Sequence, residues 1–175
     1  RKMETIHIEE KQRFKEIAFY ILLGLVQILF LWGLIQQVIF NKPWGTKPAG
    51  DIVLIVINFG IFSLIILFFS ISLKTWITDK YISFRMFPFQ IRKKVIEWSE
   101  IQSGKIVKYN GIKEYWGYGF KYMPGKGWCY TISGDFGIRI MLKNGEKILI
   151  GTHIAKEISQ VFDNLKNRGI INIID

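Results

Sequence analysis

Residues 17–40, IAFYILLGLVQILFLWGLIQQVIF, form a stretch without a formally charged side chain. As an α-helix this stretch would be about 36 Å long, which is enough to cross a hydrocarbon core of about 30 Å. A second uncharged stretch, IVLIVINFGIFSLIILFFSISL, follows at residues 52–73. Together the two stretches predict a hairpin of two transmembrane helices, and this hairpin decides the fold class.

Two other interpretations of these stretches have less support. Buried core helices of a soluble protein rarely run this long without a charge. The first stretch is too long for the apolar region of a typical signal peptide, and no small-residue cleavage site follows it at residues 40–43. Residues 41–51 contain two prolines and two glycines, which favour a tight turn between the helices.

Basic residues flank the hairpin unevenly, with many in residues 1–16 and 74–94 and only Lys42 and Lys47 in the turn. Cytoplasmic flanks are enriched in Lys and Arg, so this pattern places both termini in the cytoplasm. Trp44 and Trp76, together with Lys74, are the predicted anchors at the membrane–water interfaces. Amide side chains inside the stretches, such as Gln27 and Asn58, can hydrogen-bond between membrane helices.

The composition agrees with a membrane-bound chain. Half of the 175 residues are hydrophobic, only 22% are charged, and the formal net charge is +10. A basic balance suits nucleic acid, anionic lipid headgroups or an acidic partner. Because neither apolar stretch has a charged residue, a transport or proton-relay function has no support.

Residues 74–175 change to the alternating pattern of half-buried strands. Ile82, Phe84 and Met86 alternate with more polar residues, and Asn144-Gly145 is a strong hairpin signal. Apolar residues at helical spacing predict a helix at about 154–167.

We therefore predict an α+β membrane protein: a cytoplasmic tail at 1–16, transmembrane helices at 17–40 and 52–73, an extracytoplasmic turn at 41–51, and a cytoplasmic domain at 74–175. About seven antiparallel strands would form a small β-barrel like that of the pleckstrin-homology (PH) domain, capped by the C-terminal helix. Other small barrels are the alternatives.

Several short motifs occur in order along the chain: EKQRF at residues 10–14, RMFPF at 85–89, EYWGYGF at 114–120, GWCY at 127–130 and LIGT at 149–152. In this order and spacing, the sequence resembles an uncharacterised family of small prokaryotic two-helix membrane proteins with a bacterial PH-like domain. The resemblance implies a PH-like fold and a location in the cytoplasmic (inner) membrane of a prokaryote. It implies no known activity, so it assigns no catalytic residue.

Residues 108–126, here called the aromatic segment, are the least regular part of the predicted domain. Aromatic side chains with Gly and Lys can form a membrane contact or a peptide groove, and long irregular stretches are often functional. We take Tyr115, Trp116, Tyr118 and Tyr122 as candidate binding residues. The alternative is that Trp116 and Phe120 plug one end of the barrel.

A second candidate surface is basic. Arg85, Arg92 and Lys94 are its main residues, and alternation would place Arg92 and Lys94 on one face. Lys93, Lys105 and Lys108 are near in the sequence. A basic patch beside the bilayer gains about 1 kcal/mol per residue from an anionic leaflet. A solvated face that follows the positive-inside pattern is the alternative.

Enzymatic chemistry has little support in this sequence. Glu97 and Glu100 have no evident histidine or lysine partner, and His7, His153 and Cys129 are too few for a metal site. We therefore predict no catalytic residue, no metal and no cofactor. Nucleic-acid binding is disfavoured because no recognition motif is present and the anchor restricts access.

The leading hypothesis is a non-enzymatic, membrane-anchored adaptor. Its barrel would bind an unidentified protein partner or anionic lipid headgroups at the cytoplasmic face of the bilayer. The alternative is a structural subunit of a larger membrane complex that assembles through the two transmembrane helices.

Overall fold

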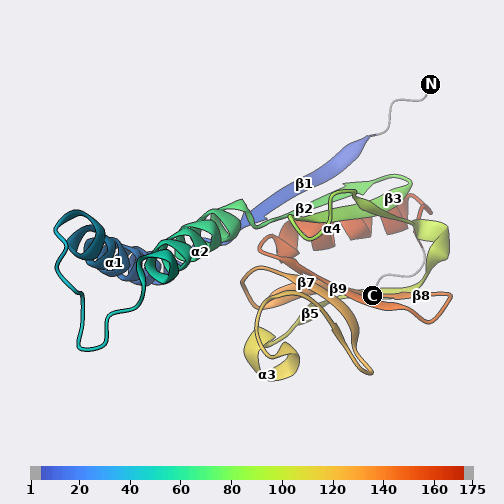
Figure 1. Cartoon of the computed structure of the whole chain (residues 1–175). Helices are drawn as coiled ribbons and strands as arrows, with labels where there is room; N and C mark the ends of the chain where they lie inside the picture. Colours follow the sequence, from blue (N-terminus) through green and yellow to red (C-terminus); the bar gives the residue numbers. More distant parts are fainter. Residues whose placement is uncertain (1–4, 172–175) are drawn as a thin grey trace. The chain divides into compact units, whose positions relative to one another are not determined.

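The computed structural model describes residues 5–171, and the chain divides into two compact units (Figure 1). One unit is the helical hairpin at Lys15–Ser70. The other unit, here called the strand domain, combines the chain before the hairpin, up to Phe14, with the chain after it, from Ile71. The domain is therefore built from both sides of the hairpin, and not only from residues 74–175 as predicted.

The helical hairpin consists of α1 (Ile17–Leu34), a π-helical continuation η1 (Ile35–Ile39), and α2 (Asp51–Ser70). Both helices are long and apolar enough to span a membrane, and few of their residues are buried. The Gln27 side-chain amide donates to Asn58 Oδ1 at 2.9 Å, and Asn58 Nδ2 donates to the carbonyl oxygens of Phe30 (3.1 Å) and Leu54 (2.9 Å). The two helices are thus joined by the amide contact that the sequence suggested.

The turn between the helices folds back on α1. The Trp44 ring lies against Gly33 so closely that a Cβ atom there would be 2.4 Å from Trp44 Cδ2, and it meets the Phe30 ring edge-on. Trp44 is therefore half-buried against the helix that precedes it. Its role at a membrane interface remains a prediction.

Nine strands within residues 5–171 form two sheets. The first sheet has the order β1-β2-β3-β4 and is wholly antiparallel; the second has the order β5-β8-β9-β7-β6, in which only β7 and β9 are parallel. The strands are β1 (Ile6–Arg13), β2 (Ser72–Thr78), β3 (Tyr81–Phe87), β4 (Lys94–Glu97), β5 (Ile101–Lys108), β6 (Gly119–Met123), β7 (Gly127–Thr131), β8 (Phe136–Leu142) and β9 (Lys147–Thr152).

The predicted closed barrel is wrong, because the strands form two separate sheets (Figure 1). The prediction of about seven strands, all antiparallel, also fails. Three short helical elements complete the domain, and the last of them is close to the predicted C-terminal helix. They are η2 (Trp98–Glu100), α3 (Gly111–Tyr115) and α4 (Ala155–Asn167).

One apolar core lies between the sheets and beneath α4. Ile158, Phe162 and Leu165 of α4 are buried in it, and Trp98 meets Phe162 edge-on. The predicted alternation holds in β3, where Ile82, Phe84 and Met86 are all buried in this core. The predicted Asn-Gly turn joins β8 to β9, with Gly145 at φ +87°.

A strand lies in the segment that we predicted to be a tail. β1 pairs with β2, and Arg13 is the register partner of Ser72. The chain therefore leaves the strand domain for the hairpin and re-enters it at neighbouring positions of one sheet. The second apolar helix ends at Ser70, so the predicted span at 52–73 is too long: Ile71 links α2 to β2, and Ser72 and Leu73 are the first residues of β2.

Buried polar groups fix β1 to the rest of the domain. The Glu10 carboxylate accepts hydrogen bonds from Thr152 Oγ1 (2.7 Å), the His153 backbone N–H (2.8 Å) and Gln12 Nε2 (2.9 Å). Gln12 Nε2 also donates to the Gly151 carbonyl oxygen at 2.7 Å. The first sheet is thereby held to the connection between β9 and α4, across more than 130 residues of sequence.

We expect Glu10→Ala to lower the free energy of unfolding by roughly 2–4 kcal/mol, because the Thr152 hydroxyl and the His153 N–H would lose a charged, buried acceptor. Glu9→Ala is the matched control, since Glu9 is exposed on the opposite face of the same strand. Denaturant unfolding of both variants measures the difference. Equal losses would show that the Glu10 contacts do not hold β1 in place.

The pairing of β1 with β2 also predicts that the strand domain can be closed without the hairpin. Replacement of residues 15–70 by Asn-Gly would join Phe14 to Ile71 through a two-residue turn, which suits paired antiparallel strands. We expect this variant to unfold cooperatively, whereas a fragment that begins at Trp76 would not, because it lacks β1 and half of β2. Circular dichroism during thermal unfolding compares the two, and similar behaviour would contradict the assigned role of β1.

Candidate functional site

The predicted binding residues do not form one surface. Arg85 lies in β3 on the face of the first sheet that points away from the core, while Arg92 is exposed in the loop before β4. Lys94 lies in β4 and forms an ion pair with Glu146. Lys105 lies in the second sheet, so the single basic patch that proximity in sequence suggested is divided among separate places.

The aromatic segment is more regular than predicted, because it contains α3 and β6. Trp116 ends α3 in the left-handed conformation (φ 56°) with 86% of its surface exposed, so it does not plug the domain. Tyr122 is also exposed, and Tyr118 packs against Gly111. Phe120 packs on the core and stacks on Trp128, with ring centroids 5.1 Å apart.

Tyr115, unlike Trp116, is buried, since only 1% of its surface is exposed. It joins Tyr109, Cys129 and Leu149 in a second small apolar cluster on the outer face of the second sheet, where α3 lies (Figure 1). Burial raises the pKa of the Cys129 thiol and of the Tyr115 hydroxyl. Tyr115 is thus a structural residue that holds α3 on the sheet.

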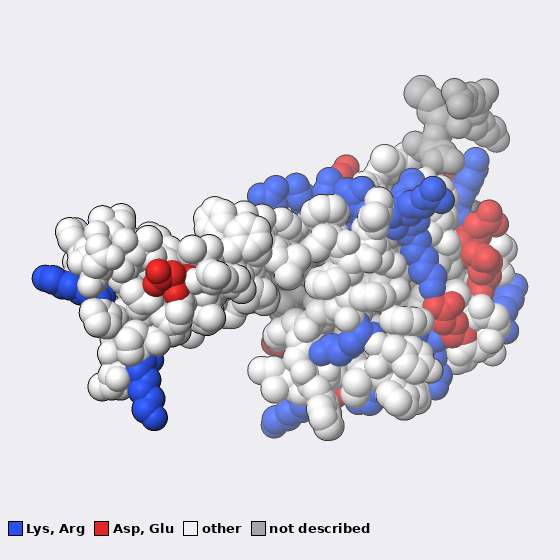
Figure 2. Space-filling model, in the orientation of Figure 1, with Lys and Arg blue, Asp and Glu red and all other residues white. Residues whose placement is uncertain are grey.

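Basic residues form a row across the first sheet, on the face that points away from the core. Lys11 of β1 is the register partner of Lys74 of β2, and Lys74 is the partner of Arg85 of β3. We call Lys11, Lys74 and Arg85 the basic ladder. Lys and Arg side chains gather on this part of the surface in Figure 2.

Like charges lie close to Lys11 of the ladder, with one nearby carboxylate, that of Glu9. Arg13 lowers the pKa of Lys11, partial burial and Lys74 act in the same direction, and only Glu9 opposes them. Within residues 5–171, Arg85 Nε is buried without a hydrogen-bond partner. Trp76, a predicted interface anchor, lies half-buried on the same face of β2. The ladder therefore presents three neighbouring cationic side chains on one face of the first sheet.

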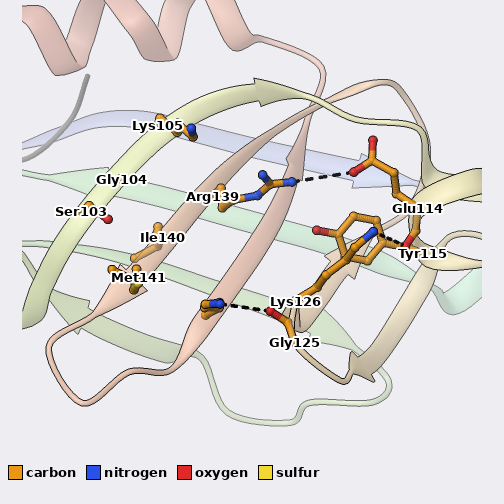
Figure 3. Close-up of a pocket in the computed structure, with 11 residues that line it drawn as sticks. Ser103, Gly104, Lys105, Glu114, Tyr115, Gly125, Lys126, Arg139, Ile140 and Met141 are labelled. Carbon is orange, nitrogen blue, oxygen red and sulfur yellow. Dashed lines mark hydrogen bonds and ion pairs between the residues drawn. The ribbon is translucent and has the colours of Figure 1, made fainter.

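A groove of about 490 Å³ lies on the outer face of the second sheet (Figure 3). Its floor comes from β5 and β8, where Lys105 and Arg139 are register partners. Its wall comes from α3, through Glu114 and Tyr115, and from the turn between β6 and β7. Lys126 in that turn and Lys147 of β9 complete a lining that contains four cations and one carboxylate.

Backbone contacts hold two of these cations in place. Lys126 Nζ donates to the Glu114 carbonyl oxygen at 2.9 Å and lies 5.1 Å from the centre of the Tyr115 ring. Lys147 Nζ donates to the Gly125 carbonyl oxygen at 3.1 Å. A Cβ atom at Gly127 would be 2.1 Å from the Lys147 carbonyl oxygen, so glycine is what allows the turn to approach β9.

One serine–histidine pair was not identified from the sequence. Ser133 Oγ lies 3.0 Å from His153 Nε2, and the same nitrogen is 3.2 Å from the Ser133 carbonyl oxygen. Among the described residues no carboxylate hydrogen-bonds the ring, so the pair lacks the orienting group of a catalytic triad. In the same part of the chain, no three His, Cys, Asp or Glu side chains are grouped as they would be around a metal ion.

The groove residues were also missed from the sequence, apart from Lys105 and Tyr115. Alternation in β8 does place Arg139 opposite the buried Ile138 and Ile140, and this was the available signal. No sequence pattern pointed to Lys126, because its position depends on the turn between β6 and β7, which can approach β9 only with glycine at position 127. Comparison of the chain with family models and with curated proteins gave no match.

Tyr115 and Trp116 give a direct test of the α3 contact, with the single cysteine as the reporter. We expect Tyr115→Ala to increase the rate at which Cys129 reacts with iodoacetamide by about tenfold or more, because the cover over the buried thiol is lost. Trp116→Ala, which removes an exposed neighbour, should leave the rate unchanged. Mass spectrometry of the native protein measures both rates, and equal rates would show that Tyr115 does not anchor α3.

Proposed function

We propose that the protein is a non-enzymatic binding module anchored in a membrane by α1 and α2, with the basic ladder held against anionic lipid headgroups. The single observation that carries this proposal is the position of the ladder on the two strands that lead into and out of the apolar helices. Both termini would then lie on the cytoplasmic side of a prokaryotic inner membrane, as the Lys and Arg distribution indicates.

Chain length limits how far the ladder can lie from the helix ends. Lys11 lies six positions before Ile17, the first residue of α1, and Lys74 lies four positions after Ser70, the last residue of α2. Such segments span at most about 22 Å and about 14 Å when fully extended. If the helices cross a bilayer, Lys74 and Lys11 must therefore lie near its headgroups, where each basic residue gains about 1 kcal/mol from an anionic leaflet.

The arrangement of the ladder also supports an external counter-charge. Like charges directly opposite each other on neighbouring strands destabilise a sheet, by up to about 1 kcal/mol per pair. The ladder contains two such pairs, Lys11 with Lys74 and Lys74 with Arg85. An anionic surface would relieve this repulsion. The free energy that the repulsion costs the isolated domain would then be regained when the domain binds a membrane.

The resemblance to bacterial PH-like proteins supports the membrane location in this proposal. Two sheets that enclose a core with a C-terminal helix are compatible with a PH-like domain, although no closed barrel is formed. The remaining exposed surface would be available to a protein partner. Trp116 is the most exposed aromatic side chain in the described part of the strand domain. The anchor would raise the effective concentration of such contacts at the bilayer.

The ladder can be tested in the full chain, reconstituted in nanodiscs of phosphatidylcholine with or without phosphatidylglycerol. We expect an amine-reactive reagent to modify Lys74 and Lys11 several-fold more slowly in the anionic nanodiscs, and high salt to remove this protection. Lys143, in the β8–β9 turn, is the internal reference. Peptide mass spectrometry gives the extent of modification at each lysine.

A matched pair of variants separates the ladder from general charge effects. Arg85→Glu should weaken the protection of Lys74, whereas Lys156→Glu, on the exposed face of α4, should not. Equal modification of Lys74 in both lipids would contradict headgroup binding. The exposed surface around Trp116 would then be the first to mutate in a search for a protein partner.

A further inference from the structure

We propose that the groove on the second sheet is a binding site for a small phosphate-bearing ligand, such as a phosphorylated polyol. This site is separate from the basic ladder, because its cations project from the outer face of the other sheet. The proposal does not depend on the membrane function of the ladder.

Charge is the first argument. The groove brings together Lys105, Lys126, Arg139 and Lys147, and its only carboxylate is that of Glu114. Arg139 Nη2 is 3.9 Å from Glu114 Oε2, which is an ion pair without a close hydrogen bond. The lining therefore keeps an excess of three positive charges, and a ligand with two or three negative charges would balance it.

The donor geometry is the second argument. Lys126 and Lys147 donate to neutral carbonyl oxygens, which fix the ammonium groups but leave their charge uncompensated and two N–H donors free on each. Within residues 5–171, no hydrogen bond or ion pair occupies the ammonium of Lys105, which is exposed on the floor. The Arg139 guanidinium also interacts with the Tyr115 hydroxyl, and its planar set of five N–H donors is of the kind that binds phosphate oxygens in a bidentate manner.

The volume and lining of the groove limit which ligands it can bind. A volume of about 490 Å³ accommodates a small molecule rather than a bare ion. The lining offers no free aromatic face for a nucleobase, because Lys126 covers the ring of Tyr115, which is itself buried (Figure 3). The remaining lining combines Ser103, Gly104 and Gly125 with the apolar residues Ile140 and Met141, and this suits a ligand that has both hydroxyl groups and carbon atoms next to its phosphate.

The test uses the full chain in phosphatidylcholine nanodiscs and inorganic pyrophosphate as the probe, measured by isothermal titration calorimetry. We expect saturable binding that weakens at least tenfold in Arg139→Gln, because the bidentate charged donor is lost. Lys105→Gln, at an exposed position, should weaken binding by a smaller factor without affecting folding. Lys143→Gln and Lys156→Gln remove equal charge outside the groove and should leave the affinity unchanged.

A second arm distinguishes a soluble ligand from a lipid headgroup. If nanodiscs that contain phosphatidic acid compete with pyrophosphate, the groove takes the phosphate from a lipid; if they do not, the ligand is a free phosphate ester. Absence of saturable binding to the wild-type chain, or equal weakening in the control variants, would overturn the proposal. Thermal unfolding of every variant verifies that a loss of binding is not a loss of fold.

Discussion

The pairing of β1 with β2 is the constraint on which the rest of this structure depends. It makes neighbours of two segments that the whole helical hairpin separates in sequence, and the buried Glu10 carboxylate holds that pairing to the start of α4. A buried carboxylate is costly to desolvate, and here three hydrogen-bond donors offset that cost. Without β1, the strand that carries Lys74 would become the edge of the sheet, and Lys11, the outermost member of the ladder, would be missing.

The same pairing explains why a two-helix insertion is compatible with a folded strand domain. The chain leaves the first sheet at Arg13 and returns at Ser72, which are register partners. The insertion thus takes the place of a hairpin loop, and the sheet is continuous whether the loop is short or long. A loop-like insertion point of this kind requires little rearrangement of the core, because Leu73 and Ile8 are already buried in it.

Local patterns in the sequence predicted the elements that are apolar throughout or that have one apolar face. The two apolar helices, β3, the hairpin of β8 with β9 and the amphipathic α4 all follow from simple periodicity. β1 was missed because its core face carries Glu10 and Gln12, which are residue types usually found exposed to solvent. Their hydrogen-bond partners are about 140 residues away in the sequence. The barrel was wrong for a related reason: alternation shows which side of a strand is buried, but not which strands pair.

Candidate sites were harder to predict than elements, because each one depends on pairing. Arg85, Arg92 and Lys105 are close in sequence but lie on the first sheet, in a loop and on the second sheet. Lys105 and Arg139 are far apart in sequence but are register partners. Tyr115 and Trp116 are adjacent, yet one is buried and the other exposed, because α3 ends between them in a left-handed turn.

The two basic surfaces differ in what constrains their partners. Two members of the ladder, Lys11 and Lys74, lie within six positions of the helix ends, so their environment depends on where those helices reside. The groove lies on the opposite outer face of the two-sheet domain, and no short chain segment connects it to the hairpin. A ligand of the groove would therefore be selected by shape and donor geometry rather than by proximity to the membrane. The ammonium groups held by backbone carbonyls and the glycine-dependent turn at the groove would favour such selection.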